Sequence, residues 1–162
     1  MKSTTDRILA GLMVALVAAL GWVVSGSMEE PITKVGDSAP VFRVQTENGK
    51  TLTEKDFGGK LLVLNFWASW CAPCVQEVPS LDQFQKEFAP QGVIVLGVSV
   101  DKNKELYERF REQYNVSFET SRDPEWDLAA KYGTFQLPET YIIDRSGKVV
   151  QKVIAAQNWM DP

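Results

Sequence analysis

Two cysteines, Cys71 and Cys74, are separated by two residues and are the only cysteines in the chain. They stand within "FWASWCAPCVQEVP", residues 66 to 79, behind two tryptophans and ahead of Glu77. A thiol pair at this spacing could form a structural disulfide, contribute to a metal site, anchor haem or exchange electrons. The residues around the pair distinguish between these four uses.

Ligand counting argues against haem and metal. Covalent haem attachment needs a histidine directly after the second cysteine, and that position is Val75. A structural zinc site needs four cysteine or histidine ligands, whereas this chain has two cysteines and no histidine. A copper carrier built on two thiols and a histidine fails for the same reason. We therefore expect no metal and no other cofactor.

A structural disulfide is the stronger alternative, because exported domains often contain one. Its weakness is the loop that it would close, since chain-entropy stabilisation is smallest for short loops. "LLVLNF", residues 61 to 66, is an apolar run typical of a strand buried on both faces. Apolar residues at spacings of three and four then predict a helix from Ala72 to Phe88, kinked at Pro79.

The position between strand and helix favours a redox pair. Cys71 would lie at the start of the helix, where unpaired backbone N–H groups and the helix dipole favour a thiolate, the nucleophile of disulfide exchange. Cys74, one turn further on, could attack the mixed disulfide that Cys71 forms and release the reduced partner. We therefore predict a disulfide that opens and closes.

The remaining elements indicate an α/β domain. Alternating apolar and polar residues flank Asn48-Gly49, a dipeptide that tolerates the positive φ of a tight hairpin. Leu106, Phe110 and Tyr114 form an apolar stripe on a later helix. In chain order we expect a hairpin at 41–52, a strand at 61–66, a helix at 72–88, a strand at 92–100, a helix at 104–114, a strand at 116–119, a helix at 125–132 and a hairpin turning at 145–147.

The first 28 residues predict a membrane segment. Lys2 and Arg7 precede an apolar run at 8–24, and no further charge appears before Glu29. This run is near the minimum for a bilayer span and longer than the core of a usual signal peptide. We expect an uncleaved single-pass anchor in a bacterial cell membrane, with the domain on the extracytoplasmic (periplasmic) side. Secretion after cleavage near 24–27 is the alternative.

Residues 29–39 are expected to be a linker, and residues 40–162 one compact domain. The final "NWMDP" could begin a helix, with Asp161 as its N-cap and Pro162 as its first residue. Because the chain stops where this helix would start, we expect the C-terminal helix to be missing, either because the sequence is clipped, which we favour, or because this member lacks the helix. A net charge of −4 without a long basic run gives no electrostatic basis for nucleic-acid binding.

"NFWASWCAPC" followed by Glu77, together with "GTFQLPETYIID", resembles the membrane-anchored thioredoxin-like proteins of the TlpA, ResA and CcmG group, in the AhpC/TSA and Redoxin superfamily. The resemblance covers about residues 36 to 160. It implies a three-layer thioredoxin-like fold, with helices flanking a mixed central sheet and an added N-terminal hairpin. It also implies a cis Pro138 beside the cysteines, with Leu137 presenting its backbone to the substrate.

The resemblance gives Glu77 a role as well. Carboxylates on helices are usually solvated, but this one follows Cys74 by three residues and can share its face. The family has a glutamate here, so we expect Glu77 to accept or relay the proton that the cysteines exchange. Trp67 could be core or could shield the thiols, and Asn65 is interpreted as satisfying a local backbone group, outside the site. The expected substrate surface consists of Trp70, Ala72, Pro73, Leu137 and Pro138.

The direction of electron flow follows from the residues between the cysteines. Ala72 and Pro73 have no charge that could hold a thiolate. Strong oxidants of this fold do hold one, and reach about −120 mV against about −270 mV for thioredoxin. We therefore expect a thiol-disulfide oxidoreductase that works as a reductant. The family implies a membrane electron donor of the CcdA or DsbD type, and clients such as apocytochrome c or copper-site assembly proteins.

Two other functions stay open. A thiol peroxidase of the AhpC/TSA type would have a Pro-x-x-x-Thr-x-x-Cys pattern, whereas Ala68 stands three residues before Cys71. A membrane-tethered binding module with an inert disulfide is the second alternative. Peroxide turnover would favour the first, and activity without Cys71 would favour the second.

Overall fold

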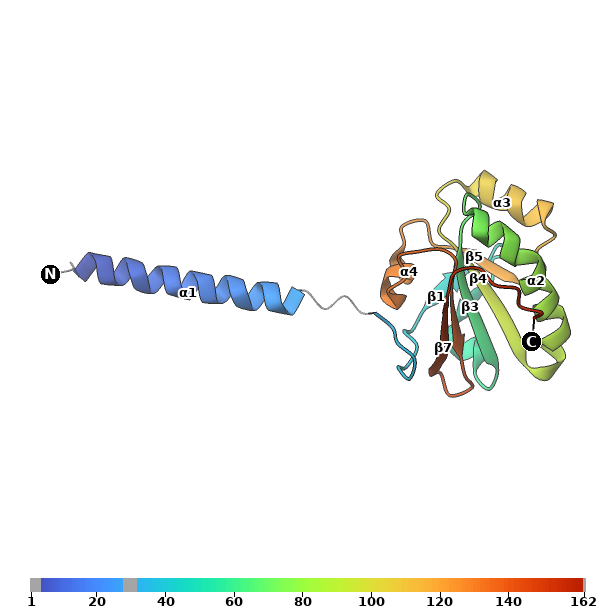
Figure 1. Cartoon of the computed structure of the whole chain (residues 1–162), viewed down its shortest axis with the longest axis horizontal. Coiled ribbons are helices and arrows are strands. Elements are labelled where there is room, and N and C mark those ends of the chain that lie inside the picture. Colours follow the sequence, from blue (N-terminus) through green and yellow to red (C-terminus); the bar gives the residue numbers. More distant parts are fainter. Residues whose placement is uncertain (1–3, 28–31, 162) are drawn as a thin grey trace. The chain divides into compact units, whose positions relative to one another are not determined.

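The computed structural model describes residues 4–27 and 32–161, which fall into two separate units (Figure 1). The first unit consists of helix α1, Thr4–Ser27. Its residues Thr4–Val23 are long and apolar enough to cross a membrane, a test that a signal sequence also passes. Lys2, Glu29 and Pro162, which entered our expectations about orientation and a terminal helix, lie outside the described residues.

A five-stranded mixed sheet forms the centre of the second unit, in the order β5-β4-β3-β6-β7. β3 is the middle strand, parallel to β4 and antiparallel to β6, and β5 and β7 are the outer strands. Six of its seven residues are buried, as the apolar run predicted. The strand bounds are β3 Leu61–Trp67, β4 Val93–Ser99, β5 Glu119–Arg122, β6 Glu139–Ile143 and β7 Val149–Ile154.

Helices cover both faces of this sheet (Figure 1). On one face, Leu81 of helix α2 packs in a cluster with Val63 and Val95. On the other face, Tyr132 of helix α4 contacts Phe66, with 5.6 Å between the ring centroids. Because successive strand residues point to opposite faces, β3 contributes to both clusters. The helix bounds are α2 Ala72–Phe88, α3 Lys104–Gln113 and α4 Asp127–Tyr132.

The apolar stripe on α3 differs from the one predicted. Tyr107 is fully buried and Phe110 nearly so, and their rings pack on Trp67 at 5.7 and 4.6 Å between centroids, whereas Leu106 is 44% exposed. The Tyr107 hydroxyl also donates to the Thr120 hydroxyl at 2.8 Å. Tyr107 occupies the inward position because its ring packs on Trp67 there and its hydroxyl has a hydrogen-bond partner.

The outer strand β5 also lies elsewhere than predicted. We expected a strand at 116–119, and β5 covers Glu119–Arg122. Phe118 is buried in the core, but the ladder with β4 uses the polar residues Thr120 and Ser121, which are buried as well. Phe118 therefore marks a contact with the core, whereas the segment that pairs with β4 begins at Glu119. Two 3-10 helices, η1 Glu54–Phe57 and η2 Ala89–Gln91, were not predicted.

The predicted N-terminal hairpin is present. β1, Arg43–Gln45, pairs antiparallel with β2, Thr51–Thr53, and Gly49 has the expected positive φ of 74°. The hairpin reaches the outer strand β5, because Thr46 forms a bridge with Ser121, whose hydroxyl donates to the Gln45 carbonyl at 2.9 Å.

The second half of the expected linker is packed on the domain. The backbone N–H groups of Gly36 and Ala39 donate to Val149 and Gly147 carbonyls at 2.8 Å each. The Val149 N–H donates back to the Asp37 carbonyl at 2.9 Å. The compact unit accordingly begins at residue 32 and not at residue 40, because these residues pair with the start of β7.

After β7, residues 155–161 run without helix toward α2 (Figure 1). Trp159 is 8% exposed and packs on Phe84 of α2, with 5.6 Å between ring centroids. This segment therefore covers part of the same sheet face as α2, because Trp159 packs in the cluster of Val63, Leu81 and Val95.

Candidate active site

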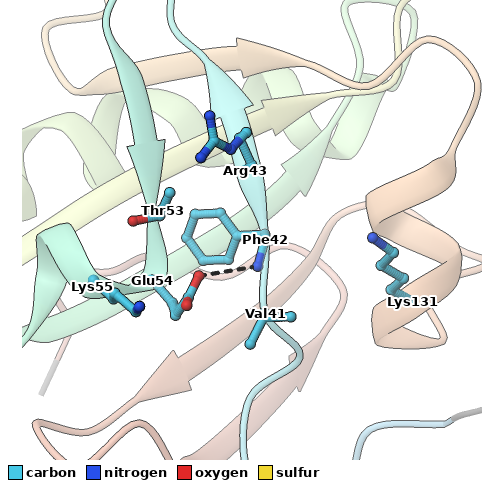
Figure 2. Close-up of a pocket in the computed structure, with 7 residues that line it drawn as sticks. All are labelled: Val41, Phe42, Arg43, Thr53, Glu54, Lys55 and Lys131. Atoms are coloured by element: carbon cyan, nitrogen blue, oxygen red, sulfur yellow. Dashed lines mark hydrogen bonds between the residues drawn. The ribbon is translucent and has the colours of Figure 1, made fainter.

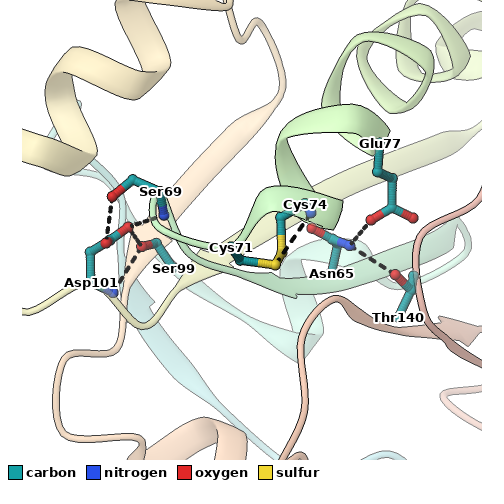
Figure 3. Close-up of a disulfide and its surroundings, with 8 residues drawn as sticks. All are labelled: Asn65, Ser69, Cys71, Cys74, Glu77, Ser99, Asp101 and Thr140. Atoms are coloured by element: carbon teal, nitrogen blue, oxygen red, sulfur yellow. Dashed lines mark hydrogen bonds between the residues drawn. A yellow bond between two sulfur atoms is a disulfide. The ribbon is translucent and has the colours of Figure 1, made fainter.

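The cysteine pair lies where β3 passes into α2, and the two sulfurs form a disulfide (Figure 3). Cys71 is the N-cap residue of α2, and its Sγ accepts a hydrogen bond from the Cys74 N–H at 3.2 Å. When the disulfide opens, this donor and the helix dipole favour negative charge on the Cys71 sulfur. Cys71 is 6% exposed and Cys74 only 1%, so Cys71 is the sulfur that a partner reaches first.

Asp101 holds the turn that leads into the cysteines (Figure 3). Its carboxylate accepts from the Ser69 N–H and hydroxyl at 2.8 and 2.7 Å, and from the Ser99 hydroxyl at 2.7 Å. Asp101 is 1% exposed and follows β4, so it ties the turn after β3 to the end of the neighbouring strand. Asp101 was not predicted from the sequence. Its position after a buried parallel strand was the available signal, because functional residues gather at the carboxyl ends of such strands.

Glu77 lies one turn after Cys74 and is 2% exposed. Its Oε1 accepts from Trp159 Nε1 at 2.7 Å, and its Oε2 from Asn65 Nδ2 at 3.2 Å. Burial raises the pKa of Glu77 above its ordinary value, although hydrogen bonds from Trp159, Asn65 and the Gln157 backbone work in the opposite direction. The carboxyl group can therefore take up a proton at a higher pH than an exposed glutamate would.

Asn65 belongs to this network, contrary to our interpretation of it as a partner of a local backbone group. Its Nδ2 donates to Thr140 Oγ1 on β6 at 2.8 Å as well as to Glu77 (Figure 3). The amide thus links β3, β6 and α2 through side chains. A polar residue in an apolar strand was the signal, but the partners on α2 and β6 could not be read from it.

The peptide bond between Leu137 and Pro138 is cis, as the resemblance implied. The next residue, Glu139, pairs with Phe66 on β3, so the proline lies at the same end of the sheet as the cysteine turn. Of the remaining residues expected to contact substrate, Leu137 is partly buried, and three are exposed: Trp70, Ala72 and Pro73. Trp67, in contrast, is 1% exposed and belongs to the core, in the same buried cluster as both cysteines.

A pocket of a different kind lies between the hairpin and α4 (Figure 2). Glu54 accepts a hydrogen bond there from the Phe42 N–H at 3.3 Å. None of the residues that line it is a cysteine or one of the expected site residues, so we place the active site at the disulfide. The lining residues are Val41, Phe42, Arg43, Thr53, Glu54, Lys55 and Lys131.

A cysteine disulfide at the start of a helix, on a mixed sheet of this topology, defines a thiol-disulfide oxidoreductase of thioredoxin-like fold. A putative thiol:disulfide interchange protein DsbE from Chlorobium tepidum superposes with a TM-score of 0.74 at 31% identity, covering 77% of this chain and 88% of that structure. The chain belongs to the AhpC/TSA family, whose model matches residues 35–152. The fold, the enzyme class and the family resemblance predicted from the sequence are thereby confirmed.

Two relatives from Bacillus subtilis (strain 168) are similar over nearly the whole chain. The thiol-disulfide oxidoreductase ResA is 34% identical over 149 residues, which are 90% of this chain and 83% of the relative. The thioredoxin-like protein YneN is 35% identical over 150 residues, which are 90% of this chain and 87% of the relative. Because members of this class exchange disulfides with proteins, the partners of this chain include protein disulfides.

Replacing Asp101 by alanine should lower the free energy of unfolding by about 2–4 kcal/mol, because the Ser69 and Ser99 donors lose their buried acceptor. Urea denaturation of the oxidised protein measures this change. Asp101→Asn keeps one acceptor oxygen and should lose less. Glu112→Ala, at an exposed position on α3, is the control and should change stability by no more than about 0.5 kcal/mol. An Asp101→Ala variant as stable as this control would contradict the role of Asp101.

Proposed function

We propose that this protein is a membrane-anchored reductase of protein disulfides, with its domain on the extracytoplasmic side of a bacterial membrane. The observation that supports it most is the Cys71–Cys74 disulfide at the start of α2, with the buried Glu77 one turn further on. The anchor would be residues 1–28, whose helix is long and apolar enough to span a bilayer. Secretion after signal cleavage remains the alternative.

Two thiol-disulfide exchanges complete the reaction. In the first, the Cys71 thiolate attacks a client disulfide, one client sulfur bonds to Cys71, and the other leaves as a thiolate. In the second, Cys74 gives its proton to Glu77 and attacks the Cys71 sulfur, which restores the Cys71–Cys74 bond and releases the second client thiolate. The two client thiolates take up one proton from Glu77 and one from water. The client thus gains two electrons and two protons, and the cysteine pair is oxidised.

The client would bind on the surface around Cys71. Trp70 is 64% exposed beside that cysteine and offers a large apolar contact. Leu137, before the cis peptide bond, would pair its backbone with an extended client segment. This surface would consist of Trp70, Ala72, Pro73, Leu137 and Pro138.

The direction of electron flow is proposed from the same site. The Cys74 N–H and the start of α2 favour the Cys71 thiolate. The residues between the cysteines have no charge that would stabilise it further. A dithiol that is stabilised only weakly passes its two electrons readily to client disulfides, which is the behaviour of a reductant. In an oxidising compartment the pair must then be reduced again by a membrane donor of the CcdA or DsbD type. The proposed clients are apocytochrome c and copper-site assembly proteins.

Equilibration of the purified full chain with a glutathione or thioredoxin couple should give a reduction potential nearer to about −270 mV than to about −120 mV. The fraction of reduced cysteines, measured by thiol alkylation, reports the potential. A value near the oxidant end of this range would show that the direction of electron flow is the reverse of the one proposed.

The Cys74→Ser variant should accumulate a mixed disulfide between Cys71 and a client, because the second exchange cannot occur. Non-reducing electrophoresis and mass spectrometry of the trapped complex identify the client. Cys71→Ser is the matched control and should trap nothing. If Cys71→Ser kept full biological activity, the disulfide would be inert and the protein a binding module, and rapid peroxide turnover by the native chain would instead support a peroxidase.

Glu77→Gln should slow disulfide exchange at neutral pH by about 100-fold, because it removes the group that takes the proton from Cys74. In the native chain, the exchange rate should rise with pH as Glu77 ionises, above the range of ordinary carboxylates because burial raises its pKa. The variant should lack this rise. Glu87→Gln, at an exposed position on the same helix, is the control and should keep it. A native pH profile in Glu77→Gln would remove the proposed role.

A pH dependence of stability accompanies this rate change. Because the folded pKa of Glu77 is raised, the folded chain keeps its proton at pH values where the unfolded chain has lost it. This contribution to stability is therefore present at low pH and is lost as the pH rises through the folded pKa. Urea midpoints measured across that range should fall less steeply for Glu77→Gln than for the native chain.

A further inference from the structure

Trp159 lies directly against the buried carboxylate of α2. Its indole Nε1 donates to Glu77 Oε1 at 2.7 Å, and its backbone N–H donates to the Ser80 hydroxyl at 3.2 Å. That hydroxyl donates in turn to the Glu77 carbonyl at 2.8 Å. The segment of residues 155–161 is thus attached to the turn of α2 that presents Glu77, through one side-chain bond and one backbone bond.

Burial and hydrogen-bond donors determine how readily Glu77 ionises. Asn65 faces it from β3, Trp159 and the Gln157 backbone from the segment after β7, and Thr140 of β6 is reached through Asn65. On the side of the redox pair, Cys74 stands three residues before Glu77 and Cys71 six residues before it. Among the described residues, no charged side chain contributes to the pKa shift of Glu77, and Trp159 is the largest of the contributions that oppose burial.

We propose that Trp159 is a positioning residue of the active site, whose indole N–H holds Oε1 of Glu77 so that the carboxylate can take the proton of Cys74. This inference rests on the proposed role of Glu77. It makes residues 155–161, which follow the last strand, part of the redox site. A carboxylate held on both oxygens, by Trp159 and by Asn65, keeps one orientation relative to the cysteine turn.

The same segment also lines a surface pocket beside the site. This pocket lies between α2 and the segment after β7 and has Glu77, which is 2% exposed, in its lining. The pocket is lined by Gln76, Glu77, Pro79, Ser80, Ala156, Gln157 and Asn158. Trp159 itself is 8% exposed and donates to the Glu77 carboxylate from within the domain.

A simpler role for Trp159 is packing alone. Its ring lies on Phe84, at 5.6 Å between centroids, and this contact needs the ring but not the N–H group. The two roles therefore predict different results when only the N–H is removed. Trp159→Phe keeps an aromatic ring and removes the donor, whereas Phe84→Leu weakens the ring contact and keeps the donor.

The test measures the pH at which the exchange rate of the full chain reaches half its maximum. Trp159→Phe should move this midpoint upward by roughly one pH unit, because the ionised carboxylate loses a charge-assisted hydrogen bond. Phe84→Leu should lower stability and leave the midpoint unchanged. If the two variants gave the same midpoint as the native chain, Trp159 would have a packing role only and the inference would be overturned.

A second measurement does not depend on the folding of the Trp159 and Phe84 variants. In the native chain, the indole N–H resonance of Trp159 should shift with pH along the titration of Glu77, and this shift should be absent in Glu77→Gln. A resonance that stays constant in the native chain would overturn the inference. The proposed role of Glu77 fails separately if Glu77→Gln leaves the rate profile unchanged, and the proposed function fails if Cys71→Ser keeps full biological activity, whatever the Trp159 variants show.

Discussion

The pairing of β3 on both of its sides determines where each part of the active site lies. Asp101 follows the end of β4 by two residues and fixes the turn before Cys71, and β6 begins directly after the cis proline. Since β3 is held in register with both neighbours, the end of this strand has little freedom to move. The cysteine turn, Asp101 and the cis peptide bond are consequently brought to one end of the sheet by the backbone pairing of β3 with β4 and β6.

Burial of Glu77 puts two opposing effects on one carboxyl group. Removal from water disfavours the ionised form, and an ion buried without partners would cost several kcal/mol. Donors from Trp159, Asn65 and the Gln157 backbone offset part of that cost. Within residues 4–27 and 32–161, no cation pairs with this carboxylate and holds its charge permanently. The result is a group that can be either protonated or ionised inside the domain, as a proton carrier between two thiols needs to be.

The sequence predicted what depends on local pattern and failed where distant residues meet. The bounds of α2, the buried strands β3 and β4 and both hairpins could be predicted, because periodicity and turn residues determine them. Glu77 was found through a family motif, but its partner Trp159 is 82 residues away and no local pattern connects the two. Asp101 lies 32 residues from Ser69. Asn65 was interpreted from its own strand alone, because the local sequence does not show that Glu77 and Thr140 face its side chain. Long-range hydrogen bonds between side chains were therefore the part that the chain alone did not reveal.

The residues before β3 affect how the protein behaves among copies of itself. An outer strand of a sheet offers unpaired N–H and C=O groups to which another chain can add. Here the hairpin bridges β5 through Thr46 and Ser121, and residues 36–39 pair with the start of β7, so part of each outer strand is already occupied. Shortening the chain at residue 40, as the predicted domain boundary would suggest, would uncover the beginning of β7 and make the isolated domain more prone to aggregate.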